Sequence, residues 1–164
     1  MSAPIIFLDF DGVLNSWEFV KRAMGHHKKY DTQGVIGLDE QAVQRLHRLC
    51  VETGARVVVS SSWRLIHDLD ELRGFLGAKG FPREWVIDVT PSCYTDEGEV
   101  HPYPCRGSEI AAWLDAHLYV DRYAIIDDDS DMGEVAHRHV KTEFAWGLRD
   151  EHCERMAAML RGDA

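Results

Sequence analysis

The stretch Ile5-Ile6-Phe7-Leu8-Asp9-Phe10-Asp11-Gly12-Val13-Leu14-Asn15 decides how the rest of the chain is interpreted. Its four leading apolar residues, bounded by Pro4 and an Asp-rich turn, predict a short strand buried on both faces. Two acids, Asp9 and Asp11, follow at once. Acids at the end of a buried strand repel each other and lose hydration, which a chain tolerates mainly when a cation lies between them or chemistry requires them. The alternative is an Asp-Gly turn with both acids solvated.

Length and composition predict one globular domain. The chain has 164 residues, 45% of them hydrophobic and 28% charged, which is ordinary for a soluble protein with a substantial core. We expect residues 1–164 to form a single domain. Because no stretch approaches a membrane span and no basic region precedes the first apolar run, we expect a cytoplasmic protein without a membrane partner. Reduced cysteines fit that setting, although Cys93 and Cys105 flank one loop and could meet.

The net charge limits the partners. The formal charge is −10, from 28 acidic and 18 basic residues. A surface that tracks long nucleic acid needs clustered Lys and Arg, so no extended nucleic-acid surface is expected. A nucleic-acid end entering one small basic pocket remains compatible with this charge, and part of the acidity would suit a metal site.

Strand and helix patterns alternate along the chain. After the opening strand, β-branched or apolar runs predict strands over residues 56–59, 85–89, 123–126 and 139–142. Amphipathic segments between them predict helices. This alternation predicts an α/β fold, a three-layer Rossmann-like parallel sheet of about five strands with helices on both faces and a minimal cap or none. Residues 16–37, with the basic tract His26-His27-Lys28-Lys29, are interpreted as a possible small cap or flap.

Local signals place the helix ends. Asp39 is the expected N-cap of a helix that stops at Gly54. A second helix is expected to bury apolar residues from Leu65 to Leu76, and a third to begin at a Ser108 cap with His117 or Leu118 facing inward. A final helix is expected over about residues 150–160.

Three of the predicted strands end in polar groups. They lead into Asp9 and Asp11, into the serines at 60–62, and into Asp127 and Asp128. Because carboxyl ends of parallel strands meet at one edge, where such sheets bind ligands, these groups should converge. Asp9 and Asp127 together would offer the hard oxygen ligands that Mg²⁺ prefers. A carboxylate there can attack phosphorus, a neighbouring acid can handle the proton, and a hydroxyl and a cation can hold the phosphoryl oxygens.

Several motifs together resemble the haloacid dehalogenase (HAD) superfamily. Asp9-Phe10-Asp11-Gly12-Val13-Leu14 is similar to its first motif, Val57 to Ser61 to the second, and Ile125-Ile126-Asp127-Asp128 to the fourth. Ser61-Ser62-Trp63-Arg64 and Arg106-Gly107-Ser108-Glu109-Ile110 resemble a smaller branch, which includes phosphatase domains of RNA-repair proteins of the polynucleotide kinase-phosphatase kind. The likeness covers nearly the whole chain.

The resemblance implies roles for the acids and serines. Asp9 would be the nucleophile and a metal ligand, and Asp11 the general acid/base with its backbone carbonyl on the metal. Asp127 would ligate Mg²⁺ and Asp128 would assist it directly or through water. Two further acids, Asp129 and Asp131, leave the register of this pair open. Ser61 is the expected phosphate ligand, with Ser60 as the alternative.

The third motif departs from the superfamily. The lysine usually found before the last acidic strand is absent, and Arg106 occupies the matching place. Its planar fork could bridge nucleophile and phosphoryl oxygens, although Arg and Lys are not equivalent. Arg64 is the second cation expected to bind phosphate, or else a surface ion pair. Trp17 and Trp63 could stack on a base or simply pack.

These features together predict a Mg²⁺-dependent phosphomonoester hydrolase that works through an aspartyl-phosphate. The substrate would be a phosphorylated small molecule, a nucleotide or the terminal phosphate of a nucleic acid. A phospho-accepting receiver-type signalling domain and a catalytically inactive binding module of the same fold are the alternatives. The sequence does not indicate the oligomeric state.

Overall fold

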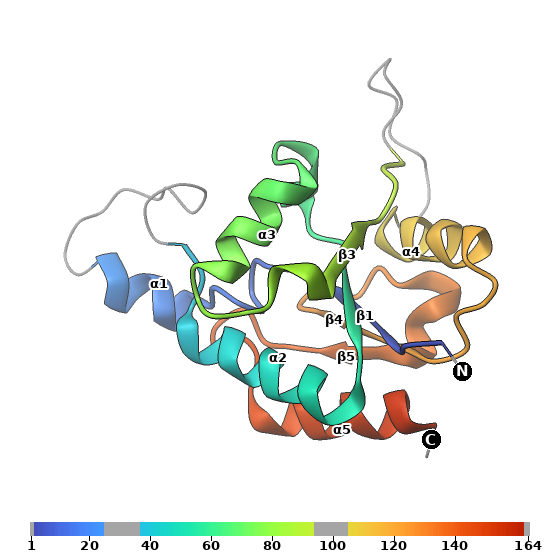
Figure 1. The fold of residues 1–164 in the computed structure, drawn as a ribbon. Coiled ribbons are helices and arrows are strands. Elements are labelled where there is room, and N and C mark those ends of the chain that lie inside the picture. Colours follow the sequence, from blue (N-terminus) through green and yellow to red (C-terminus); the bar gives the residue numbers. More distant parts are fainter. Residues whose placement is uncertain (1, 25–36, 94–104, 163–164) are drawn as a thin grey trace.

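The computed structural model describes residues 2–24, 37–93 and 105–162. Five parallel strands form one sheet in the order β3-β2-β1-β4-β5 (Figure 1). Their bounds are β1 Ile5–Leu8, β2 Arg56–Val59, β3 Val86–Val89, β4 Tyr123–Asp127 and β5 His139–Lys141. The predicted α/β fold with a parallel sheet is confirmed, and the opening strand β1 lies at its centre.

The central strand is buried on both faces, as its unbroken apolar run predicts. Ile6 and Leu8 belong to one core cluster, and Ile5 and Phe7 belong to the other. The sheet therefore separates two hydrophobic cores.

Helices cover both faces of the sheet. The larger core contains apolar residues of α2 (Glu40–Thr53), α3 (Leu69–Gly77) and α5 (Asp150–Arg161). The smaller core contains residues of α4 (Cys105–Ala116) and of the 3-10 helix η3 (Gly133–Arg138). Figure 1 shows α2 and α5 side by side, in agreement with their packing in one core. The three-layer arrangement is thus confirmed.

The segment expected to act as a cap is described only in part. A helix, α1 (Trp17–Met24), follows the loop of residues 9–16 that leaves β1. Two short 3-10 helices, η1 (Ser62–Leu65) and η2 (Arg83–Trp85), complete the described elements. Residues 25–36, which include the basic tract at 26–29, lie outside the described residues.

The first helical caps follow the sequence signals. Asp39 accepts a hydrogen bond from the Gln41 N–H at the start of α2, and Gly54 ends the helix with φ of 71°. Asp68 and Glu71 form a capping box at the start of α3. The cap of α3 explains why one long helix was wrong: η1 ends at Leu65 and a new helix begins at Leu69.

Two apolar residues that were expected to be buried in the second helix, Leu65 and Ile66, are exposed. Leu65 and Ile66 are 48% and 57% exposed, because they lie at the end of η1 and just after it rather than on a buried helical face. Of His117 and Leu118, one of which was expected to face inward, it is His117 that does so: its ring stacks on Trp113 with centroids 3.7 Å apart, and Leu118 is 87% exposed. Tertiary packing decides which apolar side chains lie inside.

The start of α4 differs from the Ser108 cap that was expected. The helix begins at Cys105, so Ser108 lies within it. The N-terminal N–H groups of Arg106 and Gly107 instead donate to Asp131, to Oδ2 at 3.4 Å and to the backbone oxygen at 3.0 Å. Because this acceptor is distant in the sequence, no local signal marks the true start.

Cysteine chemistry agrees only in part with the expectation of reduced thiols. Cys50 and Cys153 are free, whereas Cys93 is disulfide-bonded. Within the described residues, no helix is long and apolar enough to cross a membrane.

Gly107 allows α4 and the segment before η3 to touch through their backbones. A Cβ at Gly107 would lie 2.1 Å from the Met132 carbonyl oxygen, whereas a Cβ at Gly74 in α3 would meet nothing within 4 Å. We therefore expect Gly107→Ala to lower the free energy of unfolding by about 1–3 kcal/mol, the usual cost of overpacking. Gly74→Ala, the matched helical control, should raise it by about 0.5–1 kcal/mol. Urea denaturation measures both, and equal effects would contradict the backbone contact.

Candidate active site

The carboxyl ends of three adjacent strands form one site. Because β2, β1 and β4 are neighbours and parallel, their ends lie at the same edge of the sheet. Asp9 follows β1, Ser60 follows β2 and Asp127 is the last residue of β4. The register pairs Leu8 with both Val59 and Ile126, so these polar residues leave the sheet at one level.

Three carboxylates meet there. Single oxygen atoms of Asp9, Asp127 and Asp128 all lie within 4.8 Å of one another. Asp9 and Asp127 are buried, at 5% and 0% exposure, and Asp128 is half-buried. Three acids at this separation are suited to share one divalent cation.

Burial and mutual repulsion raise the pKa values of these acids. Burial, followed by the charge of Asp127, raises the pKa of Asp9 from 3.8 to about 7, although the Arg106 charge opposes this. Burial, followed by the same Asp127 charge, raises the pKa of Asp128 to about 6. Burial also raises the pKa of Asp127. The cluster is therefore costly to ionise without a cation.

Arg106, at the start of α4, lies against the acids. Its Nε is 3.3 Å from Asp127 Oδ2 and its Nη2 is 3.9 Å from Asp9 Oδ1. Among the described residues, the buried Nη1 of Arg106 and Oδ2 of Asp127 have no hydrogen-bond partner. The arginine therefore keeps an N–H donor for an anion, and the carboxylate keeps an oxygen for a cation, which fits an anion and a cation bound side by side.

Backbone and side-chain groups fix Asp127 in place. Its Oδ1 accepts the Asp129 N–H at 2.9 Å, and its backbone oxygen accepts the Thr142 N–H at 3.0 Å and lies 3.0 Å from His139 Nε2. Asp129 itself is exposed, and Asp131 caps α4 as described above. Among the described residues, the acids whose carboxylates gather with Asp9 are therefore Asp127 and Asp128.

Gly12 lets the loop pass close to the acids. Its φ is 72°, which L side chains rarely adopt, and a Cβ there would lie 2.5 Å from Asp128 Cγ. The Thr142 hydroxyl donates to the Gly12 carbonyl at 2.8 Å and anchors this loop to the end of β5. Thr142 was not singled out from the sequence, and its distance along the chain explains why.

Two side chains that do not belong to the acid cluster hold Asp11 by hydrogen bonds. Trp63 Nε1 donates to Asp11 Oδ2 at 3.0 Å and Asn15 Nδ2 donates to Oδ1 at 2.7 Å. Trp63 is 1% exposed and packs edge-on against Phe10. The stacking hypothesis for Trp63 is therefore wrong, and its indole orients Asp11 instead. Asn15, four residues after Asp11, was also missed; its amide in this short loop was the available signal.

The two serines differ in their contacts. The Ser61 hydroxyl donates to the Asp9 carboxylate, which lowers the Asp9 pKa, and its oxygen accepts the Trp63 N–H at 3.4 Å. Ser60 Oγ is buried and has no hydrogen-bond partner among the described residues. Ser61 is thus the serine beside Asp9, and Ser60 carries a hydroxyl with spare hydrogen-bonding capacity.

Arg64 does not join the acid cluster. Its guanidinium is surrounded by backbone carbonyls at the ends of β2 and β3, and it pairs with Glu109 at 2.5 Å. Both side chains are about as buried as the core, at 4% and 5% exposure. The structure therefore brings Asp9, Asp127, Asp128, Ser61 and Arg106 together, and it places Arg64 behind them.

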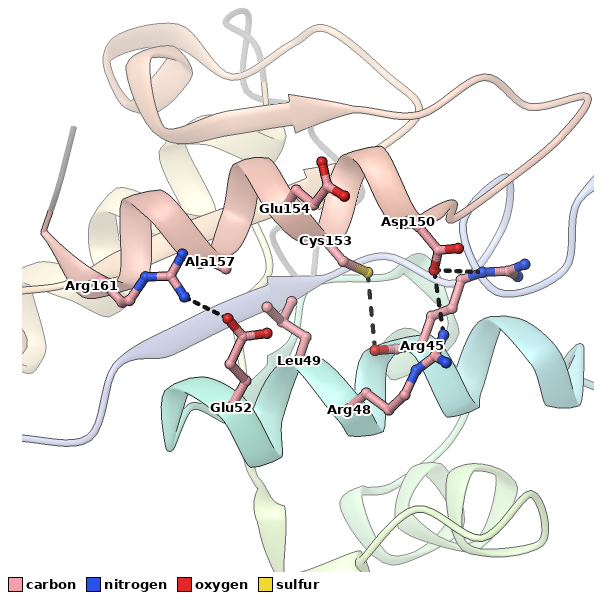
Figure 2. A pocket seen from close by; sticks show the side chains of 9 residues that line it. All are labelled: Arg45, Arg48, Leu49, Glu52, Asp150, Cys153, Glu154, Ala157 and Arg161. Atoms are coloured by element: carbon pink, nitrogen blue, oxygen red, sulfur yellow. Dashed lines mark hydrogen bonds and ion pairs between the residues drawn. The ribbon is translucent and has the colours of Figure 1, made fainter.

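A separate hollow lies between α2 and α5 (Figure 2). Its volume is about 380 Å³, and it shares no residue with the acid cluster. Figure 2 shows three ion pairs that cross between the two helices. Arg45 and Arg48 each lie 3.3 Å from Asp150, and Arg161 lies 2.5 Å from Glu52. This hollow is a groove bridged by ion pairs, and it is separate from the acid cluster.

A comparison with family models agrees with the strand-end geometry. The model described as the HAD domain in Swiss Army Knife RNA repair proteins matches residues 5–153. The chain belongs to this family. A search of curated proteins found no match. The HAD domain supports a phosphatase-type hydrolase, and the match spans β1 to α5, including every residue of the acid cluster.

The acid cluster of this HAD domain fits a metal ion. HAD domains typically use one, and the test in this structure is whether the donors suit it. All three are carboxylates, the hard ligands of Mg²⁺, and buried Asp127 Oδ2 lacks a hydrogen bond from the described residues. The residues present therefore suit a divalent cation bound by Asp9, Asp127 and Asp128.

The raised pKa of Asp9 makes stability depend on pH in the metal-free protein. An acid with a pKa of about 7 when folded and 3.8 when unfolded lowers stability progressively as pH rises through that window. Asp9→Asn removes this loss, so its free energy of unfolding should exceed that of the wild type by a few kcal/mol at pH 8 and by little at pH 4, since one pKa unit is worth about 1.4 kcal/mol. Urea denaturation across this range in a chelator measures the difference. A difference independent of pH would contradict the buried position of Asp9.

Proposed function

We propose that the protein is a Mg²⁺-dependent phosphomonoester hydrolase that acts through an aspartyl-phosphate on Asp9. The observation that supports this most is the position of one buried carboxylate, Asp9, between two further acids and the arginine fork of Arg106. A nucleophile, a cation site and an anion donor then lie at one strand edge. Family membership supports the same class of reaction.

The residues suggest a two-step reaction. In the first step an Asp9 oxygen attacks phosphorus, the bond from phosphorus to the ester oxygen breaks, and Asp11 gives that leaving oxygen a proton. In the second step Asp11 takes a proton from water, the water oxygen attacks phosphorus, and the phosphorus bond to Asp9 breaks. The Trp63 and Asn15 hydrogen bonds would orient the Asp11 carboxyl group for both transfers.

The phosphoryl group has candidate ligands around Asp9. Ser61, already in contact with the Asp9 carboxylate, and Ser60 would donate to its oxygens. Arg106 Nη1 has a spare donor in the same region and would take the place of the usual lysine. Asp9, Asp127 and Asp128, with the Asp11 backbone carbonyl, would hold Mg²⁺, which supplies positive charge against the phosphoryl oxygens.

The substrate is proposed to be a nucleotide or the terminal phosphate of a nucleic acid. The support is the family description, which places related HAD domains in RNA repair proteins. The net charge of −10 favours recognition of an end over recognition of a long strand. A small phosphorylated metabolite is the competing substrate that the assay must include.

The decisive experiment measures phosphate release from nucleotides, sugar phosphates and oligonucleotides with 3′- or 5′-phosphates. Wild type should turn over at least one ester with Mg²⁺ and lose this in a chelator. Asp9→Asn should lose roughly 10³-fold or more, as expected for a nucleophile. Asp115→Asn, an exposed acid on α4, is the control and should retain wild-type turnover.

Two results would contradict the proposal. A stable phosphoprotein without turnover would indicate a receiver-type phospho-acceptor. Mg²⁺ binding without phosphate release from any ester would indicate an inactive binding module.

The Trp63 indole provides a second test of the proposed acid/base. Trp63→Phe removes its hydrogen bond to Asp11 and should lower kcat roughly tenfold through misplacement of that carboxylate. Trp113→Phe is a matched control, because Trp113 is also buried and donates to Asp88 at 2.7 Å, on another strand. It should lose comparable stability with kcat unchanged. Equal kcat values for the two variants would remove Trp63 from the mechanism.

A further inference from the structure

Arg64 uses its full hydrogen-bonding capacity inside the protein. A guanidinium has five N–H donors. The structure supplies five acceptors: Thr90 O to Nε at 3.0 Å, Ser60 O and Ser61 O to Nη1 at 2.9 Å each, and Pro91 O at 3.1 Å and Glu109 Oε2 at 2.5 Å to Nη2. No donor is left to bind a phosphoryl oxygen directly.

The acceptors come from separate parts of the fold. Ser60 and Ser61 follow β2, Thr90 and Pro91 follow the neighbouring strand β3, and Glu109 belongs to α4. The second oxygen of Glu109 accepts the Cys93 N–H at 3.0 Å, so the pair also reaches the chain beyond β3. Arg64 therefore ties two strand ends to the helix that carries Arg106.

Three of the four carbonyls that Arg64 holds belong to residues that carry hydroxyls, namely Ser60, Ser61 and Thr90. Ser61 contacts Asp9 through its hydroxyl. Ser60 Oγ and Thr90 Oγ1 are buried and, among the described residues, lack hydrogen-bond partners. After a register shift between Val57 and Val58, their strands pair at Val58 with Asp88 and at Val59 with Val89, and the Thr90 N–H donates to the Val59 carbonyl at 3.0 Å. Fixing these backbones fixes the positions of the Cβ atoms that carry the hydroxyls and limits where the hydroxyls can lie.

A buried ion pair alone does not explain this arrangement. Burying Arg64 and Glu109 costs desolvation energy, and apolar residues of similar volume often serve stability as well or better. Only a planar fork can meet four carbonyls and a carboxylate at once, and an ammonium group with three donors cannot.

We propose that Arg64, held by Glu109, is a positioning residue that sets the backbone of residues 60–61 and 90–91 and thereby aims the serine hydroxyls at the phosphoryl group. This inference rests on the proposed function. The motif that contains Arg64 and the motif that contains Glu109 would then act together. Arg64 would act on the phosphoryl group through Ser60 and Ser61 and would not bind it directly.

The test compares kcat, KM, inhibition by inorganic phosphate and thermal stability for three variants, using an ester that the wild type hydrolyses. Arg64→Lys should lower kcat roughly 10- to 100-fold, because small misplacements of catalytic groups have effects of that size. The double variant Arg64→Met/Glu109→Met leaves no unpaired buried charge, so its melting temperature should exceed that of Arg64→Met. Its kcat should stay as low as that of Arg64→Lys. KM and the phosphate inhibition constant should change by no more than about threefold in both.

Arg73→Lys is the matched control. Arg73 also donates to a β3 carbonyl, Val86 O at 2.8 Å, and pairs with an acid, but it does so at the opposite end of the strand. Its kcat should equal that of the wild type.

Three outcomes would overturn the inference. Recovery of kcat in the double variant would show that the ion pair serves stability only. A rise in KM and in the phosphate inhibition constant at unchanged kcat would show direct phosphate binding. Absence of turnover in the wild type on every ester would instead refute the proposed function, and the inference with it.

Discussion

Electrostatic repulsion among three carboxylates is the constraint around which the structure is arranged. Asp9, Asp127 and Asp128 are brought together by two adjacent strands, and the pKa values of all three rise. A fold can hold such a cluster only if other parts of the chain fix the backbone firmly and supply positive charge. The hydrogen bonds to Asp127, the close pass of Gly12 and the placement of Arg106 all serve that need.

The two arginines near the site illustrate how one residue type takes two roles. Arg106 lies against acids and keeps a donor without a partner among the described residues, so it can still receive an anion. Arg64 has its fork filled by backbone carbonyls and Glu109, so it acts as part of the framework. The two residues carry the same charge, and their roles differ because all five N–H donors of Arg64 are bonded within the protein whereas those of Arg106 are not, among the described residues.

The sequence was sufficient for the fold and for the convergence of the acids. Unbroken apolar runs mark strands that are buried on both faces, and strand ends of a parallel sheet share an edge. It was insufficient where a partner comes from far along the chain. The cap of α4 is Asp131, one of the two side chains that bind Asp11 is Trp63, and the acid that pairs with Arg64 is Glu109. A solvated side chain and a fully bonded one look identical in sequence until the fold brings their neighbours together.

The direct backbone contact between Gly107 and Met132 also has a mechanical consequence. With no side chain between them, the first turn of α4 and the segment that follows the acids are in rigid contact. Arg106 precedes that contact by one residue, and the N–H groups of both Arg106 and Gly107 are bonded to Asp131 in the same segment. A hinge motion of α4 that carried Arg106 away from Asp127 would therefore have to break these two hydrogen bonds and this backbone contact. We expect the opposite charges of Arg106 and Asp127 to keep their separation when a ligand enters.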